Sequence, residues 1–311
     1  MANTAIAAWS SNTAAEYTIN TSDRVKANAQ FAPISIQAVN VGAGGDTLTD
    51  VALTITGNAG FVTGDLSTLN GNADGTSGIQ FYLDNGIIGT FEAGTDAQFI
   101  LSPAPTYTGT GPWTVTLYPN ASLPSGTTRN YLIVFDVAGS PTNTAEFRAA
   151  LNSVTYNTAG QKTDLATSSP SASTYFVIDT AVPTVSSRLT QDLDADGKID
   201  AVKMTLSENI LDSTLAIANF ATNHAAGYDT TFTGSFGGFT FTSGIATVTA
   251  NDTVFYLKLV ETSGTCTSSD ASGCDTDEAS TVTYTAGSLT DHAGNSLATN
   301  GPTAATDSAR P

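Results

Sequence analysis

The chain has 311 residues, which is enough for two domains whose cores need no disulfide to hold them. Its formal net charge is −18, with 28 acidic residues against 10 basic ones; this balance excludes nucleic acid as an expected partner and opposes binding to an anionic membrane surface. The charged share of 12% is about half the usual figure. The abundant Thr, Ser, Gly and Asn favour strands and turns over helices.

Short apolar or alternating runs recur along the chain, and turn residues separate them. Period-2 alternation at such lengths predicts half-buried strands. The runs cover residues 34–39, 51–55, 113–118, 131–137, 175–178, 202–206 and 254–259. Asp84-Asn85-Gly86 and Pro124-Ser125-Gly126 are typical of turns between strands. We therefore predict an all-β fold built of β-sandwiches.

Helical periodicity is scarce in this sequence. Residues 144–153 and residues 213–219 are the two stretches at which we expect a short helix. Trp113 alternates with Val115 and Leu117 in a predicted strand. We therefore expect its ring in the core, and not on an exposed sugar-binding surface.

A five-residue pattern occurs near the middle of the chain and again at its end. Residues 179–183 and 307–311 both have the form Asp-Ser/Thr-Ala-x-Pro. Proline stiffens such a junction and cannot continue a central strand. The repeat predicts two β-sandwich domains in tandem, at residues 1–178 and 179–311, with another module expected after Pro311.

The start of the chain, residues 1–4, has neither the basic nor the apolar region of a signal peptide. We therefore expect this chain to be a piece of a longer one. No apolar run approaches the length of about 18 residues that a transmembrane helix needs, so no membrane span is expected in this segment.

One acidic segment has the spacing of a metal-binding loop. Residues 192–200 read Asp-Leu-Asp-Ala-Asp-Gly-Lys-Ile-Asp, so that carboxylates recur around one glycine that permits a sharp turn. Carboxylates held this close repel one another unless a cation lies among them, and calcium takes six to eight hard oxygen ligands in flexible geometry. The predicted Ca²⁺ ligands are the side chains of Asp192, Asp194, Asp196 and Asp200 and the backbone carbonyl of Lys198.

The acidic loop resembles the EF-hand in its first six positions and departs from it afterwards. The twelfth position is Lys203 and not Glu, so the bidentate ligand is missing. Strands are expected on both sides, at residues 185–190 and 201–207. The segment is more similar to the nine-residue calcium loops in β-hairpins of the integrin α-subunit propeller. The alternatives are an acidic turn without an ion, and magnesium, which tolerates crowded protein cages poorly.

From Asp179 onward the chain resembles a bacterial immunoglobulin-like module, of the kind strung along surface adhesins and other giant cell-surface proteins. The resemblance is carried by residues 179–183, residues 203–210 (Lys-Met-Thr-Leu-Ser-Glu-Asn-Ile) and residues 289–295 (Leu-Thr-Asp-His-Ala-Gly-Asn). It implies that the second domain, 179–311, is an immunoglobulin-like sandwich. Residues 1–178 resemble no family that we can name.

In such tandem modules calcium often stiffens the junctions as well. The resemblance implies a second calcium site made of Asp179, Asp291, Asn295 and Asp307. The alternative is that these residues only form turns and caps. Another group of acidic residues surrounds Cys274 and could bind a further ion, although a solvated loop is the simpler expectation. Its members are Asp270, Asp275, Asp277 and Glu278.

The two cysteines, Cys266 and Cys274, lie close together in a stretch rich in Ser, Thr, Asp and Gly. A local disulfide can bridge this spacing in an oxidising compartment. A zinc site is not expected, because the chain has no further cysteine and no suitable histidine cluster. We expect the disulfide, and with it an extracellular or cell-surface location.

Enzymatic activity is not expected, since the sequence has two histidines and no G-x-S-x-G, phosphate-loop or dinucleotide-binding motif. We predict a structural or adhesive segment of a modular secreted or cell-surface protein, rigidified by bound calcium. Its expected partners are neighbouring modules of the same chain, other copies, or a ligand on a host or cell surface. The alternatives are a carbohydrate-binding accessory region of a secreted hydrolase and a self-assembling surface-layer or filament subunit.

Overall fold

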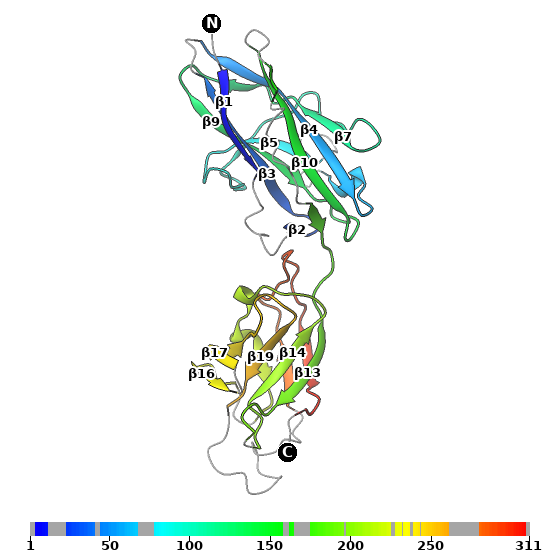
Figure 1. The fold of residues 1–311 in the computed structure, drawn as a ribbon, viewed down its shortest axis with the longest axis vertical. Coiled ribbons are helices and arrows are strands. Elements are labelled where there is room, and N and C mark those ends of the chain that lie inside the picture. The colour runs from blue at the N-terminus through cyan, green and yellow to red at the C-terminus, as the bar shows by residue number, and fades with distance from the viewer. Residues whose placement is uncertain are drawn as a thin grey trace. The chain divides into compact units, whose positions relative to one another are not determined.

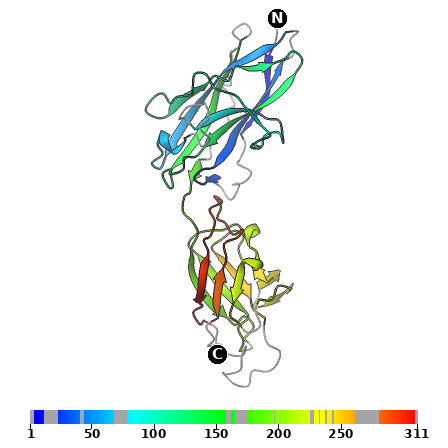
Figure 2. The same cartoon turned by 180° about the vertical axis from the view of Figure 1, so that it is seen from behind.

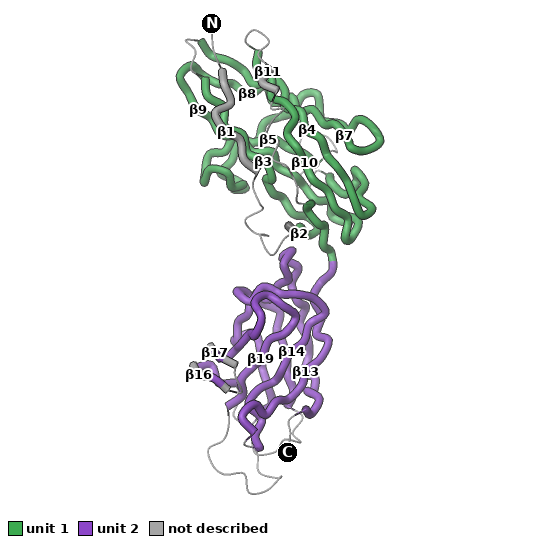
Figure 3. The backbone as a smooth tube through the Cα atoms, viewed as in Figure 1, with its two compact units in different colours: residues 1–180 green, residues 181–311 purple. Residues whose placement is uncertain are grey.

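The computed structural model divides into two compact units, Met1–Thr180 and Ala181–Pro311, which Figure 3 colours separately. Strands dominate both units. The helical elements among the described residues are three short 3-10 turns, Thr63–Asp65 (η1), Asp212–Thr214 (η2) and Ile217–Asn219 (η3). The structure describes residues 4–11, 23–40, 44–67, 78–157, 162–164, 175–195, 197–224, 228–231, 233–236, 239–242, 244–260 and 280–308.

Unit 1 is a sandwich of two sheets (Figure 1). The first sheet has the order β1-β3-β9-β5-β6, and its strands are β1 (Thr4–Ser11), β3 (Gln30–Asn40), β9 (Thr128–Asp136), β5 (Ile79–Leu83) and β6 (Ala97–Gln98). The second has the order β2-β12-β10-β4-β7, with β11 beside β10 and β8 beside β4. Its strands are β2 (Asp23–Val25), β12 (Phe176–Ile178), β10 (Glu146–Tyr156), β4 (Asp46–Asn58), β7 (Trp113–Leu117), β11 (Lys162–Asp164) and β8 (Ala121–Leu123).

Aromatic rings join the two sheets of unit 1. The ring of Phe147, in β10, packs against Phe135 of β9 at 5.9 Å and against Phe61 at 5.2 Å between centroids. Trp113 is half-buried and packs against Phe61 and Tyr107 at the margin of this core. Contacts of this kind add to the burial of apolar area that holds a sandwich together.

The outer face of the first sheet is also covered, at strands β5 and β9. Leu132 and Val134 of β9 are fully buried there, together with Tyr82 of β5. Phe91, from the connection between β5 and β6, packs edge-on against Tyr82 with 5.0 Å between ring centroids. This connection therefore lies on the sheet, and does not project from it as a free loop.

The helix expected at residues 144–153 is wrong, because this stretch begins strand β10. Strand β10 pairs antiparallel with β4 along most of its length, as Figure 1 shows. Its buried side chains Phe147, Ala149 and Leu151 alternate with less buried ones. Helix propensity differs by only tenths of a kcal/mol per residue, whereas burying one large apolar side chain is worth about 2 kcal/mol, so pairing in the sheet prevails.

Unit 2 is built of a six-stranded and a three-stranded sheet. The larger has the order β13 (Val185–Gln191), β14 (Ala201–Leu206), β19 (Val254–Lys258), β18 (Ile245–Ala246), β17 (Phe239–Thr242) and β16 (Thr233–Phe236). The smaller has the order β15 (Phe220–Thr222), β20 (Thr281–Tyr284) and β21 (Asn300–Ala304), of which β20 and β21 appear in orange and red in Figure 2. Phe255 of β19 contacts Phe220 of β15 at 5.6 Å between ring centroids, which places the core between the sheets.

A single short helix was the expectation for residues 213–219, and two separate 3-10 turns, η2 and η3, are found instead. Leu215 and Ala216, between them, have extended backbone angles. The side chains of Leu215 and Ile217 both pack against the core of unit 2, which a continuous helix of this length would not allow for neighbours two apart.

Candidate metal centre

The acidic loop connects the antiparallel strands β13 and β14, as expected from the sequence. One carboxylate oxygen each from Asp192, Asp194 and Asp200 lies within 4.8 Å of the other two. Ligands that surround one calcium ion at about 2.4 Å are separated by no more than this distance. The three carboxylates could therefore hold a metal ion.

Backbone N–H groups fix the first carboxylate of the loop. Asp192 accepts hydrogen bonds from the N–H of Ala195 through Oδ1, at 2.7 Å, and from the N–H of Gly197 through Oδ2, at 3.0 Å. Ala195 and Gly197 both have left-handed backbone angles, with φ of 64° and 88°. Glycine adopts this conformation without strain, which explains the single glycine of the segment.

The other end of the loop is anchored in the core. Asp200 is fully buried, and its Oδ2 accepts hydrogen bonds from the N–H groups of Leu193 and Asp194. Its own N–H donates to the carbonyl of Gln191 at 2.8 Å, which closes the loop. Ile199 beside it is 2% exposed. Asp200 thus both shapes the loop and presents a carboxylate to its centre.

Two of the five predicted calcium ligands are not placed by this geometry. Asp196 lies outside the described residues. The side chain of Lys198 is buried, with 9% exposure, and the role of its carbonyl as a ligand stays a prediction.

Because only the backbone of Lys198 is expected to bind the ion, Lys198→Ala should keep the calcium affinity of the chain within about threefold. Removing one positive charge near three carboxylates acts in favour of the cation, which limits any loss. Calorimetric titration of the natural and variant chains with calcium checks this. A loss of binding in Lys198→Ala would show that the side chain itself shapes the site.

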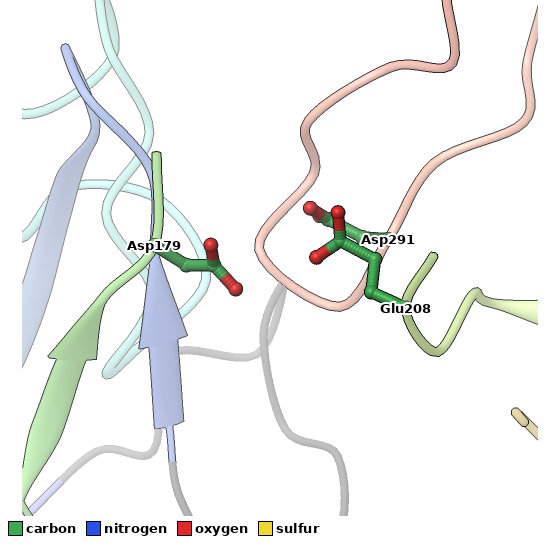
Figure 4. A group of neighbouring side chains, drawn as sticks. All are labelled: Asp179, Glu208 and Asp291. Atoms are coloured by element: carbon green, nitrogen blue, oxygen red, sulfur yellow. The ribbon is translucent and has the colours of Figure 1, made fainter. Parts of the chain in front are cut away.

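A second acidic pair lies in unit 2, where the carboxylate oxygens of Glu208 and Asp291 come within 4.8 Å of each other (Figure 4). Asp291 accepts hydrogen bonds from the N–H of Ala293 and of Asn295, both at 2.8 Å, and from the side-chain amide of Asn295 at 2.9 Å. The bridge between Ile210 and Asp291 brings the segment after β14 to this turn. Asp291 and Asn295 therefore hydrogen-bond within one turn, and Glu208 is a neighbour that the sequence did not indicate; their role as calcium ligands stays a prediction.

Asp179 and Asp307 are the other two residues that the resemblance assigns to that second site. Asp179, also drawn in Figure 4, belongs to unit 1, where Arg24 donates to its carboxylate at 2.6 Å. Asp307 lies beside Thr190, whose hydroxyl donates to it at 3.3 Å, at the end of β13 that leads into the acidic loop. Asp291 is bridged to Ile210, beyond the opposite end of β14. Unit 2 therefore does not bring Asp307 to Asp291.

The remaining candidates of the sequence fall outside the described residues. These are Cys266, Cys274, Asp270, Asp275, Asp277 and Glu278.

One histidine of unit 2 contacts a serine. The Nδ1 atom of His224 lies 3.4 Å from the hydroxyl of Ser280, and these residues are 5% and 0% exposed. The pair is packed inside the unit and offers no nucleophile at the surface. Among the described residues, no helix is long and apolar enough to cross a membrane.

No family model matches this sequence, and no curated protein matches it either. Solved structures give distant likenesses, and three of them serve as examples. The Hadza microbial sialidase Hz136 is 9% identical over 61% of this chain and 41% of its own, with a TM-score of 0.33. A cohesin module from a family 33 glycoside hydrolase of Clostridium perfringens ATCC13124 is 11% identical over 58% of this chain and 98% of its own, with a TM-score of 0.22.

The third is AvmM, which catalyses macrocyclization in alchivemycin A biosynthesis; it is 11% identical over 43% of this chain and 70% of its own, with a TM-score of 0.22. This chain spans less than half the length of the sialidase. Likenesses this low assign neither a fold family nor an activity.

Proposed function

We propose that this chain is a structural or adhesive segment of a modular secreted or cell-surface protein, and that calcium bound by the loop 192–200 stabilises its second unit. The observation that carries the proposal is the convergence of Asp192, Asp194 and Asp200 on one point, with oxygens within 4.8 Å of one another. Among the described residues, no other three acids of a single unit bring their oxygens within 4.8 Å of one another.

Calcium is the cation that the loop favours. Its donors are carboxylates, which are hard ligands, and they lie in a short loop between two antiparallel strands. Calcium takes six to eight oxygens under such conditions, whereas magnesium requires near-ideal octahedral geometry and keeps most of its water. The backbone carbonyl of Lys198, the side chain of Asp196 and water would supply the further oxygens.

The expected effect of the ion is on stability and stiffness. The folded loop holds three carboxylates at one point and the unfolded chain does not, so calcium binds the folded unit and stabilises it by mass action. Neutralising the repulsion also fixes the hairpin end that joins β13 to β14. A module stiffened in this way suits a rod that projects a binding tip or builds a surface layer.

The second unit fits a bacterial immunoglobulin-like module in that two sheets enclose one core. The turn of residues 289–295, which carries part of that resemblance, is the turn in which Asp291 and Asn295 hydrogen-bond to each other. Glu208 extends this group to three oxygen-bearing side chains in unit 2, which supports a second, weaker calcium site there.

The test is calcium removal from the natural chain and from a chain carrying Asp192→Asn and Asp194→Asn. Loss of a calcium-dependent rise in unfolding temperature in the variant supports the proposal. An unfolding temperature of the natural chain that does not respond to calcium overturns it. Specific binding of the chain to a glycan array would instead favour a carbohydrate-binding accessory region.

A further inference from the structure

A second acidic segment, in unit 1, is the connection between β5 and β6, residues 84–96. It begins where the N–H of Asp84 donates to the carbonyl of Asn130 in β9, at 3.0 Å. Phe91, in its middle, packs on Tyr82. The connection therefore leaves the ladder between β5 and β9 at Asp84, and Phe91 holds it against the outer face of the first sheet.

Three carboxylates lie within these 13 residues, at Asp84, Glu92 and Asp96. Asp96 accepts hydrogen bonds from the N–H of Asn85 at 2.9 Å and from the N–H of Glu92 at 2.7 Å, one on each oxygen. Glu92 accepts one from the N–H of Ile87 at 2.7 Å, through Oε2. Its carboxylate lies so close to Gly86 that a side chain at this position would have to displace it. These bonds fold the connection back on itself.

Asp84 has an oxygen that these bonds do not satisfy. The residue is 8% exposed, and its Oδ2 accepts a hydrogen bond from the N–H of Gly89 at 2.7 Å. Its Oδ1 is buried and accepts no hydrogen bond. A buried carboxylate oxygen without a donor is unfavourable unless a cation or a proton satisfies it.

The charges around Asp84 make its ionised carboxylate still less favourable without a cation. Burial is the largest cause that raises the pKa of its carboxyl, and the negative charges of Asp96 and Glu92 raise it further, while N–H groups of Gly89 and Gly86 act in the opposite direction. The two charged groups that act on it are thus both acidic. Hydrogen bonds do not remove the repulsion among the three carboxylates. A divalent cation bound between them would do so.

We propose that the connection 84–96 is a calcium-binding site of unit 1, with Asp84 Oδ1 and the carboxylate of Glu92 as its charged ligands. Asp96 is a positioning residue, because both of its oxygens hold backbone N–H groups of the connection. Oxygens from the three acids do not all fall within 4.8 Å of one another, unlike those of the loop 192–200. The remaining ligands are therefore backbone carbonyls, the amide oxygen of Asn85 and water, as calcium accepts.

The site is tested by counting calcium ions bound to the full chain in equilibrium dialysis with radioactive calcium. Asp84→Asn keeps the shape of the side chain and removes its charge, and Asp50→Asn, outside the connection, is the matched control. Both are made in the natural chain and in the Asp192→Asn, Asp194→Asn background. We expect Asp84→Asn to lower the number of bound ions by one in both backgrounds, and Asp50→Asn to leave it unchanged.

A second variant and a stability measurement separate binding from folding. Glu92→Gln, at a half-buried position, is expected to weaken calcium binding by about tenfold without unfolding the unit. With chelator present, Asp84→Asn should unfold at the temperature of the natural chain or above it, because it removes a buried negative charge whose charged neighbours, Asp96 and Glu92, are both acidic. An equal number of bound ions with and without Asp84→Asn overturns the proposal, and would leave water or a proton as the partner of Oδ1. The count is repeated in the background in which the loop 192–200 has lost two carboxylates. An ion lost from the loop is therefore distinguished from an ion lost from the connection 84–96.

Discussion

Adding calcium to the chelated chain is expected to raise the unfolding temperature of unit 2 by about 10 °C. At ~1 mM calcium, a loop with a dissociation constant of ~10 µM is saturated about 100-fold, which stabilises the folded unit by about 2.7 kcal/mol. For a unit of 131 residues, each kcal/mol corresponds to about 4 °C. Differential scanning calorimetry of the full chain, in calcium and in excess chelator, measures the shift.

The charge of the loop determines the unfolding temperature that we expect for the variant with and without calcium. Asp192→Asn with Asp194→Asn removes two of the three converging carboxylates, so the calcium response of unit 2 should disappear. In chelator, the same variant should unfold within about 4 °C of the natural chain. An amide at position 192 keeps only one of the two N–H bonds that Asp192 accepts, and the weaker repulsion of Asp200 offsets part of that loss. The matched control is Asp252→Asn, whose carboxylate accepts a hydrogen bond from the N–H of Val254 outside both acidic groups. A control that also lost the calcium response would show a general charge effect and no site.

The acidic loop could be predicted from the sequence because all of its parts are local. Carboxylates at alternate positions, a glycine and two flanking strands lie within about twenty residues, and the hairpin of β13 and β14 brings them together. The spacing therefore determines the geometry, and three of the four predicted carboxylates, Asp192, Asp194 and Asp200, do converge.

The other acidic groups depend on contacts that spacing does not reveal. Glu208 and Asp291 are far apart in the sequence, and they meet only because the segment after β14 is bridged to the turn of residues 289–295. At Asp84 the sequence predicts only a turn, since Asp-Asn-Gly is typical of hairpins. What distinguishes it is the burial of one oxygen, which follows from the packing of the connection on the sheet.

The strands themselves were predictable where alternation was clear, and strand β10 shows where this fails. Its first residues include Ala, Glu, Arg and Leu, which favour helices locally. The partner that makes it a strand, β4, lies about 100 residues earlier in the chain. Local patterns cannot show such a pairing, and for the same reason the strand order of the four sheets could not be predicted.

Replacing Asp200 by alanine is expected to destabilise unit 2 whether calcium is present or not. Asp200 is fully buried, and its carboxylate accepts hydrogen bonds from the N–H groups of Leu193 and Asp194. Alanine leaves both donors without this acceptor, which costs about 3 kcal/mol and lowers the unfolding temperature by about 10 °C in chelator. This separates Asp200 from Asp194, an exposed residue whose replacement by asparagine should matter only when calcium is present.

Asp200→Asn distinguishes the two tasks of the residue. The amide oxygen can still accept the two N–H bonds, so most of the stability in chelator should return, while the missing charge should keep calcium binding weak. Thermal unfolding in chelator and calorimetric titration with calcium measure the two effects separately. If asparagine restored both, the charge of Asp200 would not be needed for the ion, and the site would rest on Asp192 and Asp194 alone. If alanine proved as stable as the natural chain in chelator, the loop would be closed by the backbone bond from Asp200 to Gln191, and the side chain would act only as a ligand.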